Sequence, residues 1–390
     1  MLIRPAVPGV APTVHDPVRR VAIGQAAVGF AINSIGASLV LLARDLGREP
    51  EALAGLAASF GAGLLIVGAV GPVLLRRGAG SVIRLAALVT AAGAAVLATG
   101  STAAVAATGA VLLGTGSAGV VLATPALLAG PAAAAQLCVV NAIASVCGML
   151  GPLAIGLLDL GFGHGRLALL LVVPPLLVLA VLAPAAPPAP PPVRTASGGP
   201  RPHSVAVAWG AVVLGVSIEF CFAIWAAARL QQTGLGAGTA ASVAVAFLLG
   251  MAVTRFVAPA LIGRGVPVVP VGCALVVAGT VGVALPGTGA VVAGLVVAGI
   301  GTAVLYPVTV ARLVGLPGLS IAHGTSLGAV ASGTAITVAP VVLAALGAAL
   351  DLRAAYLIAV LPLAAALMVA TRTGRDGRAS PPRRRATPAP

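Results

Sequence analysis

The sequence predicts an all-α polytopic membrane protein with twelve transmembrane helices in two pseudo-symmetric six-helix bundles. Three observations lead to this fold class. Hydrophobic residues make up 59% of the chain and charged residues only 8%, whereas about one-quarter of the residues in soluble domains are charged. Apolar stretches long enough to cross a bilayer recur from end to end. The two halves of the chain also repeat each other.

The internal repeat has a displacement of 187 residues. At this displacement Phe60, Gly63, Pro72, Leu74, Arg77 and Gly78 recur as Phe247, Gly250, Pro259, Leu261, Arg264 and Gly265, and Gly114 and Thr115 recur as Gly301 and Thr302. A near-equal displacement carries Arg44 onto Arg229. Two similar halves in an apolar chain are typical of transporters, because they can rock about a site that lies between them.

Each half contains six apolar stretches of helical spanning length. We expect membrane spans at 21–42, 52–74, 85–101, 103–129, 134–158 and 167–183, and at 205–228, 239–262, 267–286, 290–311, 325–350 and 354–371. These spans divide the chain into an N-terminal bundle (1–183), a Pro-rich cytoplasmic linker (184–203), a C-terminal bundle (204–372) and a basic cytoplasmic tail (373–390). We expect the tail to be disordered, and the linker prolines to exclude a helix interior.

The arginines predict the orientation in the membrane. With both termini in the cytoplasm, sixteen of the 22 arginines lie on the cytoplasmic side, as the positive-inside rule requires. We therefore expect a multi-pass protein of the bacterial inner membrane. The net charge of +14 does not indicate nucleic-acid binding, because the arginines are dispersed between apolar spans and form no single basic face with aromatics.

Glu219 is the acidic residue that we place deep in a span, about fourteen residues, or about 21 Å, from the start of its helix. Ionisable residues within a membrane are costly and mark functional sites by default. Glu219 is therefore our candidate for binding and releasing a coupling proton. A structural ion pair or hydrogen bond to a neighbouring helix is the alternative.

Arg255 is the candidate partner of Glu219. On the predicted spans the depths of the two residues differ by about 10 Å, although a guanidinium side chain is long enough to shorten this gap. A direct pair is thus left open. We interpret Arg255 as a structural or gating group rather than a ligand of the substrate.

Several polar and aromatic side chains are candidates to line the same cavity. They are Gln25, Asn33, Asn141, Phe222, Trp225 and Tyr306. Gln25 and Asn33 are eight residues apart and share a helix face, and Phe222 lies one turn from Glu219. The alternative for each is hydrogen bonding or packing between helices. Pro152, Pro307 and Pro340 lie within spans and predict helix bends.

Two enzyme motifs are discounted. Gly114, Gly116 and Gly119 match a dinucleotide pattern, but no strand precedes them. Gly324, Ser326 and Gly328 match a serine-nucleophile pattern without the strand-to-helix elbow. The histidines show no metal-ligand spacing. We predict no enzyme activity, no cofactor and no metal.

The segment Gly71 to Gly78 resembles a loop of the major facilitator superfamily that controls conformational switching. The Arg76, Arg77, Gly78 end of the motif is retained, while Leu75 replaces the usual acid. The resemblance extends from about residue 18 to residue 372. It implies a conformational switch at Gly71, Arg76, Arg77, Gly78 and Arg264.

Individual helices of the chain resemble different branches of this superfamily. The region around Pro152 partly resembles an antiporter motif of the drug and sugar efflux branches. The regions around Glu219 and Tyr306 are more similar to the fucose-permease-like branch. The resemblance implies alternating access by the two bundles, and leaves both uptake and efflux open.

From these observations we expect a secondary active transporter for a small organic solute, coupled to protons through Glu219. A substrate that is neutral or amphipathic fits a cavity with few charges. One alternative is a membrane sensor or scaffold that has a transporter-like fold without transport. Another is an intramembrane enzyme that uses Ser326.

Overall fold

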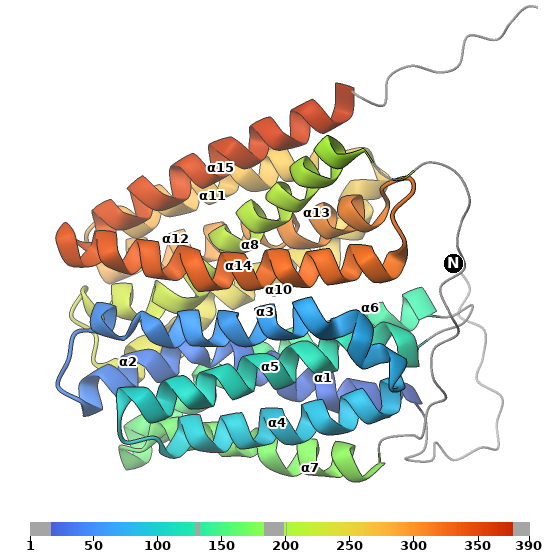
Figure 1. Ribbon diagram of the computed structural model, residues 1–390. Helices are drawn as coiled ribbons and strands as arrows, with labels where there is room; N and C mark the ends of the chain where they lie inside the picture. Colours follow the sequence, from blue (N-terminus) through green and yellow to red (C-terminus); the bar gives the residue numbers. More distant parts are fainter. Residues whose placement is uncertain (1–16, 129–132, 183–198, 200, 377–390) are drawn as a thin grey trace, which may run out of the picture.

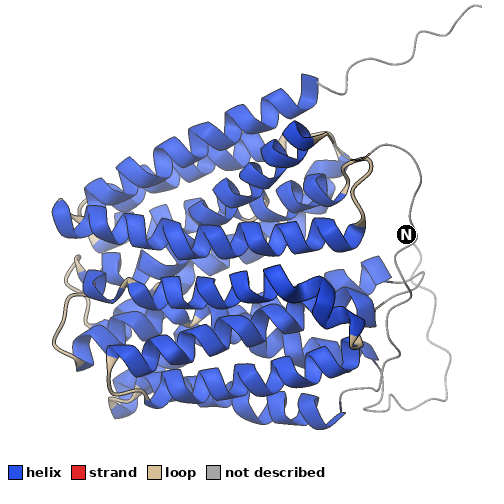
Figure 2. Ribbon diagram, in the orientation of Figure 1, coloured by secondary structure: helices blue, strands red, loops and turns tan. Residues whose placement is uncertain are grey.

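The computed structural model describes residues 17–128, 133–182, 199 and 201–376. All regular elements within these residues are helices (Figure 2). Figure 1 shows them as two stacked layers, with the first half of the chain in blue to green and the second in yellow-green to red. This arrangement confirms the predicted fold class of two helical bundles.

The N-terminal bundle contains seven α-helices and two 3₁₀ helices within the described residues. They are α1 (Pro17–Asn33), α2 (Ile35–Asp45), η1 (Pro50–Leu53), α3 (Gly55–Arg76), α4 (Ala79–Thr99), α5 (Ala103–Leu127), α6 (Ala133–Phe162), η2 (Gly165–Val172) and α7 (Val173–Leu182).

The C-terminal bundle contains eight α-helices within the described residues. They are α8 (Pro202–Gln231), α9 (Ala237–Val243), α10 (Val245–Gly263), α11 (Val268–Ala284), α12 (Thr288–Thr302), α13 (Leu305–Val314), α14 (Ile321–Ala349) and α15 (Leu352–Asp376).

Ten helical segments of the described chain are long and apolar enough to cross a membrane. In addition, α1 and α2 meet at a bend of 44°, and α11 is apolar with a length of 17 residues. Together these segments account for the twelve predicted spans, and the chain is a multi-pass membrane protein. Most of the predicted linker, residues 184–198 and 200, and residues 377–390 of the predicted tail lie outside the described residues.

The internal repeat is visible in the packing of the helices. Gly114 on α5 packs against the backbone of Phe60 on α3, and Gly299 on α12 packs in the same way against Phe247 on α10. A side chain at either glycine would collide with the facing carbonyl group, so these positions require glycine for close helix approach. The structural counterpart of Gly114 is therefore Gly299, and the predicted match with Gly301 is wrong by two residues.

Helices α1 and α15 define the two ends of the molecule. The terminal end is the end at which α1 begins and α15 finishes, on the right in Figure 1, and the other is the opposite end. Helices α3 and α14 pack against each other across the bundle interface. At this seam Ser326 Oγ donates a hydrogen bond of 2.7 Å to the carbonyl of Gly68. At the opposite end, α2 packs against α8 and α9, and α6 packs against α9.

Candidate functional site

Glu219 lies on α8 and forms an ion pair with Arg255 of α10. Arg255 Nη2 is 3.9 Å from Glu219 Oε1, and the side chains of Arg255 and Glu219 are 37% and 19% exposed, respectively. The sequence left this pair open because straight, parallel helices would separate the two residues in depth. Helix α8 is instead visibly tilted against α14 (Figure 1), and the long guanidinium side chain of Arg255 covers the remaining difference in depth.

The same arginine also contacts the other bundle. Arg255 Nη1 donates a hydrogen bond of 2.8 Å to Ser145 Oγ on α6. The Ser145 hydroxyl in turn donates to the backbone carbonyl of Asn141, at 2.9 Å. The hydroxyl proton of Ser145 is therefore used in a hydrogen bond within α6, and the hydroxyl oxygen accepts a hydrogen bond from the Arg255 guanidinium. Arg255 thus links a carboxylate of the C-terminal bundle to a hydroxyl of the N-terminal bundle.

Tyr306 lies beside this pair, just after the break between α12 and α13. Its side chain interacts with Ser332 of α14 and electrostatically with both Glu219 and Arg255. We call Ser145, Glu219, Arg255, Tyr306 and Ser332 the polar cluster. Five helices contribute to it, so any movement of one bundle against the other changes its geometry.

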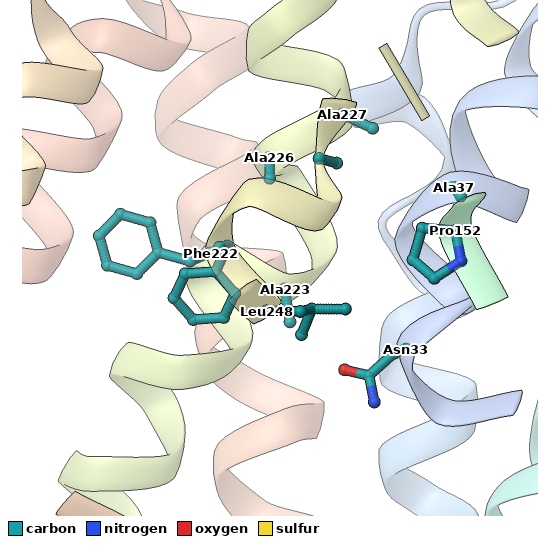
Figure 3. A pocket seen from close by; sticks show the side chains of 10 residues that line it. Asn33, Ala37, Pro152, Phe222, Ala223, Ala226, Ala227 and Leu248 are labelled. Carbon is teal, nitrogen blue, oxygen red and sulfur yellow. The ribbon is translucent and has the colours of Figure 1, made fainter. Parts of the chain in front are cut away.

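A small cavity lies between the bundles, next to the polar cluster and toward the opposite end. Figure 3 shows Asn33 and Pro152 on one side of this cavity and Phe222, Ala223 and Leu248 on the other. The remaining lining residues are Ala37, Ala226, Ala227, Ala244 and Phe247. Asn33 supplies the polar side chain of the lining, since the other nine residues are apolar.

Of the predicted cavity residues, Gln25 and Trp225 make contacts within their own bundles. Gln25 Nε2 on α1 donates to Thr124 Oγ1 on α5 at 2.8 Å. Trp225 is fully buried, and its Nε1 donates to the carbonyl of Pro340 at 2.9 Å. Both contacts join neighbouring helices.

The other predicted cavity residues lie at the interface between the bundles or pack against side chains there. Phe222 stacks between Phe247 and Tyr356, with ring centroids 5.4 and 5.2 Å away. Asn141 is exposed on α6, four residues before Ser145. Asn33 and Phe222 line the small cavity, and Tyr306 belongs to the polar cluster.

The break between α1 and α2 is a feature that the sequence interpretation missed, because it drew residues 21–42 as one span. Asn33 Nδ2 donates to the carbonyl of Gly29 at 2.9 Å, and Ser34 Oγ donates to that of Phe30 at 2.8 Å. Side chains that hydrogen-bond to the preceding turn weaken the helical ladder and bend helices. The adjacent Asn33 and Ser34 were the available signal.

The predicted bends at prolines fall at different places in the helices. Pro152 and Pro340 lie inside α6 and α14, and Pro307 lies in the first turn of α13, just after the break from α12. The structure also has prolines inside α10, at Pro259, and inside α15, at Pro362.

The predicted switch residues lie at the terminal end. Gly71 is buried on α3, Arg76 ends α3, and Arg77 follows it as an exposed residue. Gly78 then turns the chain with a φ of 92°. At the equivalent turn of the second half, Arg264 caps α10 and Gly265 has a φ of 75°. Positive φ angles favour glycine, so the repeat preserves the turn in both halves.

An ion-pair network at the opposite end was not predicted. Arg44 makes two hydrogen bonds to the buried carboxylate of Asp159, of 2.6 and 3.0 Å, and a third of 2.9 Å to Asp45. Arg166 Nη2 is 3.3 Å from Asp45 Oδ2. Arg44 and Asp159 are 115 residues apart and become neighbours only through the fold, so their spacing gave no signal.

The fold and the polar cluster define a class of protein, a polytopic helical membrane protein with an ionisable site between two bundles. Solved structures are similar over most of this chain. The nucleoside transporter NupG aligns with a TM-score of 0.71 at 12% identity, covering 92% of this chain and 99% of its own. The E. coli fucose:proton symporter FucP aligns with a TM-score of 0.61 at 18% identity, covering 92% and 98%.

These similarities show that the chain has the fold of the major facilitator superfamily. No family model matches the sequence, and no curated protein sequence matches it. At identities this low the comparisons establish the fold, and the chemistry of the chain rests on its own residues.

Proposed function

We propose that the chain is a secondary active transporter that moves a small organic solute by alternating access, with protons as the coupling ion. The observation that supports this most strongly is the pair of Glu219 and Arg255 at the interface of two apolar bundles. Ionisable residues at such depth are characteristic of substrate pathways and proton relays.

In this proposal Glu219 is the group that binds and releases the proton. Its side chain is 19% exposed, so water can reach it, and its ion pair with Arg255 is long at 3.9 Å. A carboxyl group with a weakly held partner can change its protonation state without leaving a tightly bound arginine unpaired. The proton passes from the carboxyl to water at whichever end is open.

We propose a neutral or amphipathic substrate. Glu219 and Arg255 already balance each other's charge, so a highly charged solute would leave its own charge unpaired. Tyr306, Ser332 and the exposed Asn141 offer hydrogen bonds to a hydroxylated solute. The named cargoes of NupG and FucP, a nucleoside and fucose, are solutes of this kind and are the first to test.

We further propose that the terminal end faces the cytoplasm of a bacterium. The arginine-rich turns at Arg76, Arg77 and Arg264 lie at this end, in keeping with the positive-inside rule. Gly71, Gly78 and these arginines would then form the switch on the cytoplasmic side. Both α6 and α2 pack against the other bundle at the opposite end, which supports a conformation closed to the outside.

The surroundings of Ser326 favour transport over catalysis. Its hydroxyl donates to the carbonyl of Gly68. The Nδ1 atom of nearby His323 is 2.6 Å from Ser320 Oγ instead. A serine nucleophile needs a base within hydrogen-bond reach, and here the histidine is engaged elsewhere.

Transport in proteoliposomes with and without a pH gradient tests the proposal. Labelled uridine and fucose are the first probes, followed by a panel of neutral solutes. Glu219→Gln should abolish gradient-driven accumulation while the protein remains folded. Glu49→Gln is the matched control, since Glu49 is an exposed carboxyl in the loop before η1. Wild-type accumulation by Glu219→Gln would refute the assignment.

A further inference from the structure

Arg255 has two partners, and they belong to different bundles. Its hydrogen bond to Ser145 on α6 is 2.8 Å long, whereas its ion pair with Glu219 on α8 is 3.9 Å long. Different nitrogens of one guanidinium can bind two acceptors, but here only Nη1, on Ser145, is at hydrogen-bond distance, while Nη2 stays beyond that distance from Glu219. In this conformation the N-terminal bundle therefore draws Arg255 away from Glu219.

The two partners respond differently to movement between the bundles. Glu219 and Arg255 lie on α8 and α10 and move together, while Ser145 moves with α6. When α6 separates from α10, Arg255 loses its serine acceptor but keeps the carboxylate. The strength of the Glu219 ion pair then depends on whether this seam is closed.

We propose that Ser145 is a positioning residue that couples closure of the α6–α10 seam to proton binding at Glu219. With the seam closed, Ser145 holds the guanidinium and the carboxylate is poorly neutralised, so Glu219 takes up a proton. With the seam open, Arg255 closes on Glu219, stabilises the carboxylate, and the proton leaves to water. The inference rests on the proposed proton coupling and names the residue that connects it to conformation.

The other groups around Glu219 are consistent with this arrangement. Among the described residues, the titratable groups that interact with it are Arg255 from α10 and Tyr306 from α13. The contribution of α14 to the polar cluster is the neutral Ser332. Tyr356 of α15 interacts with Cys221 and Arg229 instead. No second carboxylate in this set competes for Arg255.

Proton binding and seam closure are linked thermodynamically, and this linkage can be measured without a substrate. If Glu219 binds its proton more tightly when the seam is closed, acidification must favour the closed seam, because linkage is reciprocal. One charge-assisted hydrogen bond is sufficient to change the closed-to-open ratio about tenfold. Removing the Ser145 hydroxyl should reduce this pH dependence to less than about threefold.

Electron-spin distance measurements on the full chain test this prediction. Spin labels would be attached at the exposed positions 139 on α6 and 262 on α10, which lie on the two sides of this seam and outside the proposed switch, after replacement of the four native cysteines. The distance distribution is then followed as a function of pH. Ser145→Ala should lose most of the pH dependence, and Ser145→Thr, which keeps a hydroxyl, should retain it.

Ser59→Ala is the matched control. Like Ser145, Ser59 donates its hydroxyl to the carbonyl four residues earlier, at 2.7 Å, so its loss tests for a general effect on a helix. Wild-type pH dependence in Ser145→Ala, with its loss in Glu219→Gln, would overturn the role of Ser145 and leave proton coupling intact. Wild-type pH dependence in Glu219→Gln would overturn the proposed coupling itself.

Discussion

At the opposite end of the molecule, each bundle uses an arginine to bind the carbonyl groups at the end of one of its helices, but the two arginines stand at different positions of the repeat. In the N-terminal bundle, Arg166 donates to the carbonyls of Leu97 and Gly100 at the end of α4, at 3.3 and 2.8 Å. In the C-terminal bundle, Arg229 donates to Val283 and Leu285 at the end of α11, at 2.9 and 2.8 Å.

Each of these arginines has a counterpart in the other half with a different task. Arg44, displaced by 185 residues from Arg229, binds Asp159, and Arg353, displaced by 187 from Arg166, is exposed. Helix ends need donors for their last carbonyl groups, and an arginine from either position supplies them. In both halves an arginine therefore donates to the carbonyl groups at a helix end, but this arginine occupies a different position in each copy of the repeat.

The carboxylates differ between the bundles in a similar way. Asp159 of the N-terminal bundle faces Gly238, and Glu51 lies near Gly347. The repeat relates Glu51 to Gly238, at 187 residues, and Asp159 to Gly347, at 188. At the opposite end each seam thus combines a carboxylate of the N-terminal bundle with a glycine of the C-terminal bundle. In the C-terminal bundle, by contrast, the carboxylate of Glu219 lies in the middle of the bundle interface.

The largest expected effect concerns the buried arginine. Arg229 is 0% exposed, so Arg229→Gln would leave the buried carbonyl of Val283 and the part-buried carbonyl of Leu285 without their donors and lower the free energy of unfolding by about 3 kcal/mol. Arg166→Gln should cost about 1 to 2 kcal/mol, because water can replace part of its role at a side chain that is 13% exposed.

Thermal unfolding of the detergent-solubilised variants measures this order. Arg353→Gln, which changes the exposed counterpart of Arg166, is the control and should melt with the wild type. Equal losses for Arg229→Gln and Arg353→Gln would contradict the division of tasks between the two halves.

The second effect concerns the α6–α9 seam. Gly156 packs directly against Gly238 and Ser242, so Gly156→Ala should separate these helices at a cost of about 2 kcal/mol, a typical penalty for overpacking. Spin labels at the exposed positions 48 and 232 should report a longer distance at the opposite end.

Gly161 is the matched control for this substitution. It lies on the same helix, and an alanine Cβ at this position would have no heavy atom of another residue packed within 4 Å, so Gly161→Ala should leave the distance unchanged. If Gly156→Ala also leaves it unchanged, α6 and α9 do not form the closing contact.

The smallest effect concerns the hydrogen bond between Trp225 of α8 and Pro340 of α14. Trp225→Phe removes the donor to the Pro340 carbonyl and should lower the free energy of unfolding by about 1 kcal/mol. Ser38, displaced by 187 residues, is buried, and its hydroxyl has no hydrogen-bond partner among the described residues. Ser38→Ala should therefore be neutral in the same melting assay, and a loss equal to that of Trp225→Phe would contradict this asymmetry.

The sequence was sufficient to predict the spans and the repeat, because hydrophobic length and glycine spacing are local properties. The predicted span 205–228 falls within α8, and 103–129 agrees with α5 to two residues. The bend at Ser34 was missed although Asn33 and Ser34 signal it, because hydropathy does not register side chains that hydrogen-bond to the preceding turn. The contacts of Arg255 could not be established from the sequence, because they depend on how α10 packs against α8 and on Ser145 from the other half.

Infrared difference spectroscopy tests most directly whether Glu219 of the C-terminal bundle is the group that binds the proton. Protonation of a carboxylate in reconstituted protein gives a carboxylic-acid C=O band as the pH is lowered. We expect the wild type and Glu49→Gln to share a band component from Glu219 that is absent from Glu219→Gln. Persistence of the full band in Glu219→Gln would contradict the assignment of the proton site to Glu219.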